Sequence, residues 1–422
     1  MKLDTSRATP RVRHARRAIT LTSFIHSAVY TSWVARIPQV QDALGLSTAE
    51  LSEAFLGLTF GPLLSIPLVG WATHRYGSRV AVRLTLLASC VTLGLPALAG
   101  NLATLFVCLA LFSAATAGLS MALNAHGVTV QAHYRRPMFA TVHAANSFGG
   151  VLGSVAGAIA AAASVPPATH LGCAAALCTV VGIVSTRWLL PGASDRGVDR
   201  RPRGLSLPDR QTLTGPLLGL GMLALCVIVV ESAVTNWSAI YLSDGLGAGT
   251  AVASAGFIVF ASAMATGRMF ADRVGARFGT VRTVRTAATV AALTLITTVT
   301  IGHPVAAIIG LAVLGAGLSA LVPATMRAAG ELPDVPRAGG IAAVSTAGYL
   351  GGLAGPASFG FTAGVVGLSG AFAGMALLVL LAAGLAGILA VARASVPTAG
   401  GVPEQQIRAG NVEPPREHHP GR

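Results

Sequence analysis

The 422-residue chain has little charge. Asp, Glu, Lys and Arg together make up 10% of it, whereas a soluble domain carries about a quarter. Aromatic residues are also few, at 5%, while hydrophobic residues reach 53% and the mean hydropathy is +0.69. Fifty glycines suit packed membrane helices better than soluble ones. The scarcity of charge excludes an ordinary soluble domain and indicates a polytopic α-helical membrane protein.

The sequence also lacks the patterns that carry most enzyme chemistry. Its five cysteines all lie in apolar segments without paired spacing: Cys90, Cys108, Cys173, Cys178 and Cys226. They predict neither a disulfide framework nor a metal site. A nucleotide-binding glycine loop and a nucleophile elbow are not evident either. We therefore expect no cofactor, no metal, no catalytic residue and no enzyme activity.

The basic residues are placed as in a membrane protein. The formal net charge is +14, but the charges form short clusters between apolar segments, which is not the pattern of a nucleic-acid-binding face. If the N-terminus lies inside, only Arg36 of the 29 Lys and Arg residues falls on the outer side. This bias predicts an inner-membrane protein with both termini in the cytoplasm, a lipid bilayer as its surroundings and no nucleic-acid partner.

Twelve apolar segments are long enough to cross a bilayer. They are centred roughly on Ser27, Leu63, Leu87, Phe112, Leu152, Val181, Val227, Phe260, Ala292, Val313, Gly351 and Leu381. A Pro- and Arg-rich stretch separates the sixth from the seventh. We expect a cytoplasmic N-tail (1–16), a six-helix bundle (17–190), a cytoplasmic linker (191–214), a second six-helix bundle (215–394) and a disordered cytoplasmic C-tail (395–422).

Four short stretches recur in order in the second half at a nearly constant offset. "HRYGSR" at 74–79 matches "DRVGAR" at 272–277, and "AGLS" at 117–120 recurs at 316–319. "SFGGVLG" at 147–153 resembles "YLGGLAG" at 349–355, and "HSAVYTSW" at 26–33 matches "ESAVTNW" at 231–237. Such repetition predicts two six-helix halves related by an axis along the membrane normal, with binding between them near the midplane.

These stretches carry a resemblance to a known family. "GWATHRYGSR" and "GRMFADRVGARFG" resemble the loop signature of the major facilitator superfamily. "WVARIP", "LNAHGVTVQ", "ESAVTNWSAIYL" and "GYLGGLAGP" are most similar to the rhizopine-permease-like branch, near the fucose-permease-like transporters. The resemblance implies alternating access by a monomer. It also implies a cytoplasmic gate formed by Gly70, His74, Arg75, Gly77, Arg79, Arg268, Asp272, Arg273 and Arg277, although His74 stands where the family has aspartate.

Glu231 is the one acid of fifteen that cannot be placed in a tail, a loop or a helix end. An ionisable residue at membrane depth indicates a functional site. Its repeat partner is His26, and the resemblance implies that helices one, four, seven and ten line a central cavity. We expect Glu231 to be the proton-coupling acid, with His26 as its partner or relay. The alternatives are a glutamate that ties helices together and a neutral histidine held by backbone or by Tyr30.

Polar and aromatic residues on the same helices are candidates for contacting substrate. Tyr30 and Trp33 share a helix face with His26, and Thr235 shares one with Glu231. The expected substrate-binding set is Tyr30, Trp33, Asn124, Gln131, His143, Asn146, Thr235, Asn236, Trp237 and Tyr349. Trp33 and Trp237 also fit a belt at the outer membrane interface. Arg36 fits an outer latch with Asp42 or Glu53, or a surface ion pair of little consequence.

The function expected from these features is secondary active transport, with proton-coupled uptake of a small polar solute such as a sugar or polyol. An exporter of drugs or metabolites that exchanges them for protons remains an alternative. A membrane sensor that does not transport is a further one. The low aromatic content and the eight methionines favour hydrophilic cargo over amphiphiles.

Overall fold

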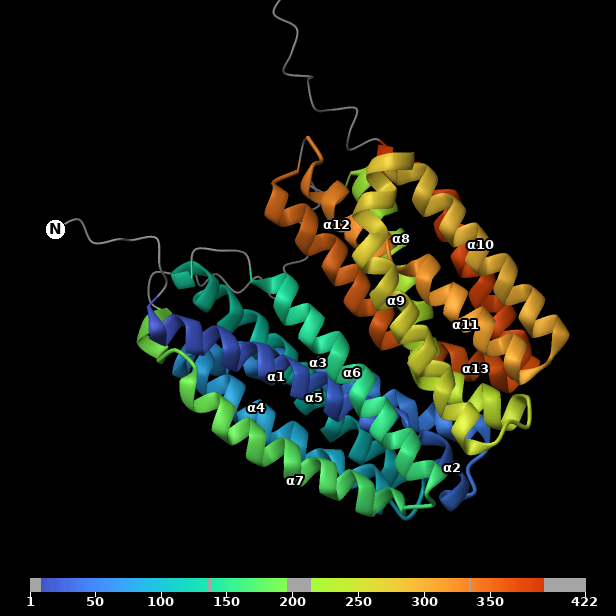
Figure 1. Ribbon diagram of the computed structural model, residues 1–422, viewed down its shortest axis with the longest axis horizontal. Coiled ribbons are helices and arrows are strands. Elements are labelled where there is room, and N and C mark those ends of the chain that lie inside the picture. The colour runs from blue at the N-terminus through green and yellow to red at the C-terminus, as the bar shows by residue number, and fades with distance from the viewer. Residues whose placement is uncertain (1–8, 135–137, 196–213, 334, 391–422) are drawn as a thin grey trace, which may run out of the picture.

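The regular elements are helices throughout the residues that the computed structural model describes, which are 9–134, 138–195, 214–333 and 335–390. Figure 1 shows two groups of long helices, blue to green and yellow to red, that lie side by side and approach each other near α2. Half of the expected N-tail, most of the expected linker and all of the expected C-tail fall outside the described residues.

In the described part of the first half there are seven α-helices and three short 3₁₀ turns. The helices are α1 (Pro10–Val34), α2 (Ile37–Leu44), α3 (Thr48–Tyr76), α4 (Ser78–Leu93), α5 (Leu102–Tyr134), α6 (Phe139–Ala162) and α7 (Pro167–Ser185). The 3₁₀ turns are η1 (Leu95–Leu98), η2 (Thr186–Trp188) and η3 (Gly192–Asp195). Several helices begin where the sequence favours it: Pro10 and Pro167 occupy first positions, and Ser47 with Glu50 forms a capping box on α3.

The second half repeats this plan. It contains α8 (Gly215–Ile240), continued by one π turn, η5 (Tyr241–Gly245), then α9 (Thr250–Phe278), α10 (Thr280–Ile301), α11 (Pro304–Leu318), α12 (Leu321–Gly330) and α13 (Arg337–Leu385). The 49-residue α13 is interrupted at Gly367, whose φ of 77° and ψ of 166° are not helical. Glycine reaches this conformation without a steric penalty, so α13 consists of two helices that meet at a kink there.

The polytopic all-α fold expected from composition is confirmed. Ten helical segments among the described residues are long and apolar enough to cross a membrane. The last one, Gly339–Ala390, has 52 residues, more than twice the roughly 20 that one crossing needs. The first helix, α1, is not among the ten, and its first two turns are rich in arginine. These observations are consistent with twelve crossings, and α1 begins at Pro10, ahead of the boundary expected at residue 17.

Both halves contain a helix-to-helix turn made by one glycine. Gly77 joins α3 to α4 with φ of 90°, and Gly279 joins α9 to α10 with φ of 85°. The structural repeat therefore pairs "RYGS" with "RFGT" at an offset of 202 residues. The match of "HRYGSR" with "DRVGAR" is four residues out of this register. Because four residues make about one helical turn, the slip keeps the helix face and changes the depth.

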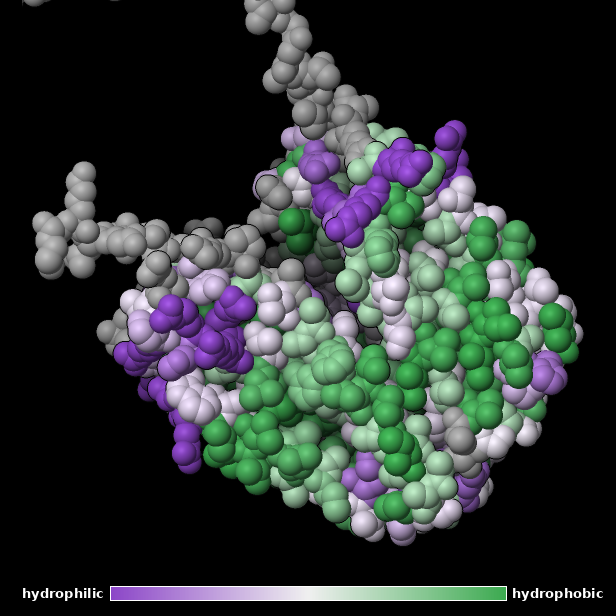
Figure 2. Space-filling view, viewed as in Figure 1, coloured by the Kyte–Doolittle hydropathy of each residue, from purple (hydrophilic) through white to green (hydrophobic). Residues whose placement is uncertain are grey.

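The two halves meet at the end of the molecule that carries α2, called here the α2 end. Thr59 Oγ1 of α3 donates a 2.6 Å hydrogen bond to the Leu353 carbonyl of α13. Closer to α2, Phe55 of α3 packs edge-on against Trp237 of α8, with ring centroids 5.1 Å apart. At the opposite end, called the terminal end, α1 begins and α3 ends. Figure 2 shows a hollow between the two halves that opens toward the terminal end.

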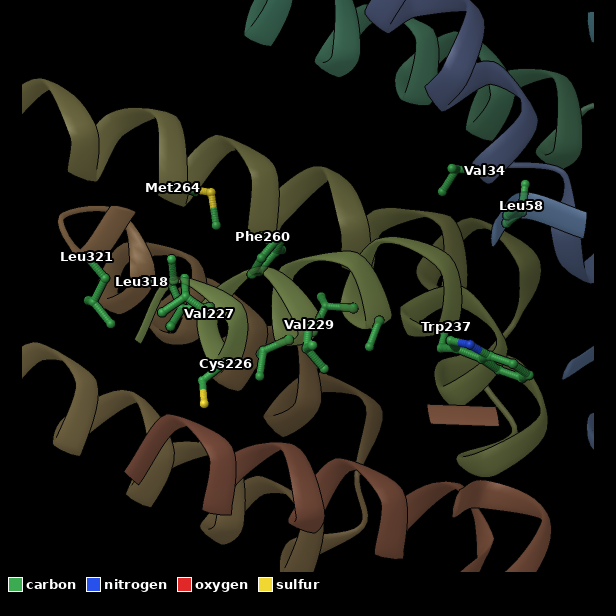
Figure 3. Close-up of a cluster of buried hydrophobic side chains, with 14 of the residues drawn as sticks. Val34, Leu58, Cys226, Val227, Val229, Trp237, Phe260, Met264, Leu318 and Leu321 are labelled. Atoms are coloured by element: carbon green, nitrogen blue, oxygen red, sulfur yellow. The ribbon is translucent and has the colours of Figure 1, made fainter. Parts of the chain in front are cut away.

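The distribution of hydropathy over the surface is that of a membrane-spanning molecule. In Figure 2 apolar residues cover the middle of the molecule and hydrophilic residues gather at its two ends. Both α8 and α9 contribute buried side chains to the core: Figure 3 shows Phe260 and Met264 of α9 and Val227 and Val229 of α8 in one cluster. Arg268 follows Met264 by one turn on α9.

Candidate functional site

Glu231 lies deep in the molecule and not at a helix end. It is sixteen residues beyond the start of α8, about 24 Å at 1.5 Å per residue. Its Oε1 lies 3.5 Å from Nη2 of Arg268 on α9, and the side chains of Glu231 and Arg268 are 28% and 40% exposed. The two charges thus compensate each other while both remain accessible, as expected of charged groups that line a water-filled cavity.

Arg268, the partner of Glu231, was expected from the sequence to belong to the cytoplasmic gate. It lies ten residues before the end of α9, about 15 Å from the terminal end, and Nη2 also contacts Met264 Sδ at 2.9 Å. His143, on α6 of the other half, is close enough to interact electrostatically with Arg268. Because α6 packs against α9, this cluster of Glu231, Arg268 and His143 joins the two halves.

His26 is held inside its own half. Its Nδ1 lies 3.3 Å from the Asn146 amide nitrogen, so Nδ1 accepts and Nε2 donates to the Thr116 carbonyl at 3.2 Å. The Asn146 amide also donates to the Ser23 carbonyl at 3.1 Å. The described contacts include none between His26 and Glu231. The histidine therefore connects α1 to α5 and α6, and the Glu231 carboxylate has Arg268 as its partner.

Tyr30 and Asn236 bring the two repeat-related helices together. The Tyr30 hydroxyl interacts with the Asn236 side chain across the two halves, and its ring stacks on Phe112 at 6.1 Å between centroids. Asn236 also donates to the Ser232 carbonyl at 2.8 Å. Thr235 Oγ1 donates to the Glu231 carbonyl at 2.6 Å, so this hydroxyl is already occupied by the backbone of α8.

The two repeat-related tryptophans are fully buried, which is incompatible with a belt at the membrane interface. Trp237 donates from Nε1 to the Pro356 carbonyl at 2.8 Å and packs between Phe55 and Phe359. Trp33 Nε1 has no hydrogen-bond partner in the part of the chain that the structure describes. Trp237 therefore seals the contact between the halves at the α2 end.

The remaining predicted substrate residues are dispersed. Asn124 and Tyr349 are exposed, whereas Gln131 is half-buried and accepts a hydrogen bond from the Met138 backbone nitrogen at 3.4 Å. In the part of the chain that the structure describes, no group of three His, Cys, Asp or Glu side chains could hold a metal ion.

Comparison with known proteins identifies the family. The model of the Major Facilitator Superfamily matches residues 19–304. The chain belongs to the major facilitator superfamily. An uncharacterized MFS-type transporter of Yersinia pestis is 30% identical over 86% of this chain and 92% of the relative. The membrane protein MosC of Rhizobium meliloti is 28% identical over 87% of each chain.

Solved structures share the superfamily fold. A bacterial homologue of the human lysosomal transporter Spinster, in an inward-facing and unoccupied conformation, gives a TM-score of 0.73 at 13% identity, covering 92% of this chain and 98% of that one. A D-xylose–proton symporter gives 0.70 at 15% identity over 89% and 97%. The protein is thus an integral membrane transporter of the major facilitator superfamily and not an enzyme. Members of this superfamily bind small-molecule substrates and generally work as monomers.

Among the described residues, no ion pair links the two halves through the residues expected to form a cytoplasmic gate at the terminal end. Asp272 pairs with Arg327 of α12 at 2.7 Å, within the second half. Arg79 donates to the Arg187 carbonyl at 3.1 Å, within the first half. His74, Arg273 and Arg277 are exposed, Arg75 lies over the Tyr76 ring, and Gly70 faces Met121. Neither of the two ion pairs among the described residues crosses between the halves at this end.

Arg36 at the α2 end is not a surface residue. It is 1% exposed and donates from Nη2 to the Val165 carbonyl, and the two ion pairs of the described residues do not involve it. The latch expected between Arg36 and Asp42 or Glu53 is therefore not formed among the described residues. Burial lowers the pKa of Arg36. The sequence reading also missed Arg327 and the buried His126, since neither stands out in its local sequence.

Proposed function

We propose that this transporter takes up a small polar solute, such as a sugar or polyol, by proton-coupled alternating access. The observation that carries the proposal is the ion pair of Glu231 with Arg268 at membrane depth, with both side chains partly exposed. A charge at this depth is costly. The ion pair has a use that offsets this cost, because the Glu231 carboxylate can bind a proton in place of Arg268, and Arg268 can bind a substrate group in place of Glu231.

The coupling follows from competition for one carboxylate. While Glu231 is ionised, its attraction to Arg268 favours the arrangement in which α8 and α9 hold the two groups together. Protonation removes that attraction and frees guanidinium donors for a substrate hydroxyl or for His143. A proton thus changes both the binding site and the relative stability of the two access states, which is the differential interaction that coupling requires.

The proposed access state is inward-facing. Its support is the closed contact of Trp237 with Phe55 at the α2 end, the hollow at the terminal end and the clustering of basic residues on the terminal side. The positive-inside rule assigns that side to the cytoplasm. The substrate would then leave past His143 toward the terminal end.

Reconstitution into proteoliposomes tests the proposal. The purified protein is first screened by thermal shift against sugars, polyols, amino acids and drugs, since a bound ligand stabilises the folded state. The stabilising compound is then supplied outside vesicles with an acidic exterior. We expect accumulation above the outside concentration, abolished by a protonophore. Accumulation that ignores the protonophore would contradict proton coupling, and expulsion against the same gradient would favour the exporter.

A further inference from the structure

A basic pocket lies at the terminal end of the first half, away from the ion pair of Glu231 and Arg268. It has a volume of about 340 Å³ and is lined by Arg11, His14, Arg79, Arg187, Trp188 and Leu189. This volume is in the range of about 300–1,000 Å³ that small-ligand sites occupy. The residues come from three separate places: the first two turns of α1, the first turn of α4 and the segment that follows α7.

Among the described residues, no carboxylate lines the pocket to balance its charges. Arg79 lies close enough to Arg11 and Arg83 for their charges to repel one another. Neither ion pair of the described chain involves the lining residues. The Arg79 Nε atom is buried and has no hydrogen-bond partner among the described residues. Like charges held together in this way gain most from an anion that several guanidinium groups share.

The walls of the pocket are fixed by hydrogen bonds. Arg79 and Arg83 donate to the carbonyls of Arg187 and Thr186, each at 3.1 Å. Beneath them, the fully buried His126 of α5 lies 2.7 Å from Ser78 Oγ and accepts the Leu190 N–H at 3.3 Å. A buried side chain thus ties the start of α4 to the segment that contains Arg187 and Trp188, so the pocket is preorganised.

An apolar face adjoins the pocket. From Val80 onward, α4 exposes Leu84 and Val91, and α7 exposes Leu177, Val180 and Val184 as it runs toward Trp188. The two helices pack against each other and lie side by side in Figure 1. Trp188 itself is half-exposed, as is usual for a tryptophan at the level of lipid headgroups. A ligand with a phosphate at one end and acyl chains at the other matches this combination.

We propose that the pocket binds a phosphate group, and that an anionic phospholipid supplies it. The guanidinium groups of Arg11, Arg79 and Arg187 contact the phosphate, while the acyl chains lie along the exposed face of α4 and α7. Basic pockets between transmembrane helices are known to hold anionic headgroups in this manner. The lipid then joins α1, α4 and the segment after α7 into one unit at the terminal end.

The test uses the full-length purified protein in lipid nanodiscs. Dioleoyl phosphatidylglycerol is titrated against a background of dioleoyl phosphatidylcholine, with the midpoint of thermal unfolding and the lipid retained in native mass spectrometry as readouts. We expect the double substitution Arg79→Gln and Arg187→Gln to weaken phosphatidylglycerol binding by about tenfold or more, since each basic residue near the surface contributes to anionic-lipid binding. Arg79→Lys with Arg187→Lys should retain part of the binding.

A control with the same loss of charge separates this site from general surface attraction. Arg273 and Arg277 are exposed near the end of α9 in the second half, and their replacement by Gln should change phosphatidylglycerol binding less than twofold. Equal losses in the two double variants would overturn the proposal. Inorganic phosphate at matched concentration should give little protection; if it stabilises the protein as well as phosphatidylglycerol does, the lipid assignment is wrong.

Discussion

The carboxylate of Glu231 and the guanidinium of Arg268 lie 3.5 Å apart on neighbouring helices α8 and α9. The pair lies within membrane-spanning helices, where an isolated charge is costly, and Arg268 interacts with His143 of the opposite half. Each group in this cluster therefore has a role that substitution can test.

Replacement of Glu231 by Gln should abolish uphill accumulation and preserve exchange of substrate between the two sides. The amide keeps the shape and the hydrogen bonds of the carboxylic acid but cannot release a proton. Accumulation driven by a pH gradient and counterflow without a gradient would be measured in the same proteoliposomes. Glu53→Gln, an exposed acid of α3, serves as the control and should behave as the wild type. Undiminished accumulation by the Glu231 variant would contradict its coupling role.

Arg268 and Glu231 should act as one unit. We expect Arg268→Gln to reduce accumulation about as strongly as Glu231→Gln, because each change leaves the other group at membrane depth without its partner. The double variant should be no worse than either single one, since groups in contact couple by about 0.5–3 kcal/mol and their effects do not add. A double-mutant cycle on initial uptake rates measures this, and strictly additive losses would show that the pair is not coupled.

The sequence located the acid of this site more readily than its partner. Glu231 stands out because a charge in an apolar run has few structural explanations. The partner of Glu231 depends on the rotation and depth of the helices, which a sequence repeat does not specify. The repeat places His26 and Glu231 on related helices, but His26 forms its hydrogen bonds with Thr116 and Asn146. Arg268 lies within the stretch that resembles a gate motif. That resemblance indicates a position at the membrane surface, whereas Arg268 lies deeper in α9.

The fold was more predictable than the site, because hydropathy and charge bias are properties of long segments. Local register was less so. The match of "HRYGSR" with "DRVGAR" is the better one letter by letter, but the turns at Gly77 and Gly279 set the repeat four residues away. Since one helical turn preserves the apolar pattern, sequence similarity alone could not choose between the two registers.

Gly360 of α13 should be intolerant of any side chain in the access state seen here. A Cβ at this position would lie 2.5 Å from Trp237 Cζ2 and 2.6 Å from Ser52 Cβ, which is inside contact distance. Gly360→Ala should therefore weaken closure at the α2 end and shift the population toward opening there. Spin labels at the terminal ends of α3 and α12 would report a shorter distance between the halves.

A matched control lies one turn further along the same helix. The Cβ of Gly364→Ala would meet Ala49 at 3.8 Å, an ordinary contact, and should leave the distance distribution unchanged. Identical distributions for the wild type and Gly360→Ala would show that this close approach does not determine closure.

The stability that the contact at the α2 end contributes should also depend weakly on pH. Partial burial, followed by the charge of Asp244 on the other half, raises the pKa of Asp42. A raised pKa means that the folded contact binds more protons than the unfolded chain, so stability falls as pH rises from about 3.8, the ordinary value, through the raised one. Asp42→Asn should remove this part of the pH dependence and raise the unfolding midpoint slightly at neutral pH.

Ionic strength provides the check on this last effect. Asp42 is largely solvated, so added salt should screen the repulsion and reduce the difference between the wild type and Asp42→Asn. The unfolding midpoints of both proteins would be measured from pH 4 to 8 at low and high salt. If the unfolding midpoint of Asp42→Asn were higher by the same amount at every pH, the effect would come from packing and not from charge.

The hydrogen bond from Thr59 to Leu353 has a mechanical consequence. If it lies near the pivot between the halves, α3 is a lever whose long arm extends seventeen residues to Tyr76, about 26 Å at 1.5 Å per residue. A rigid-body rotation of about 15°, as known for subunit rotations, would displace the tip of that arm by about 7 Å. Small rearrangements of packing at the α2 end would thus be magnified into an opening wide enough for a solute.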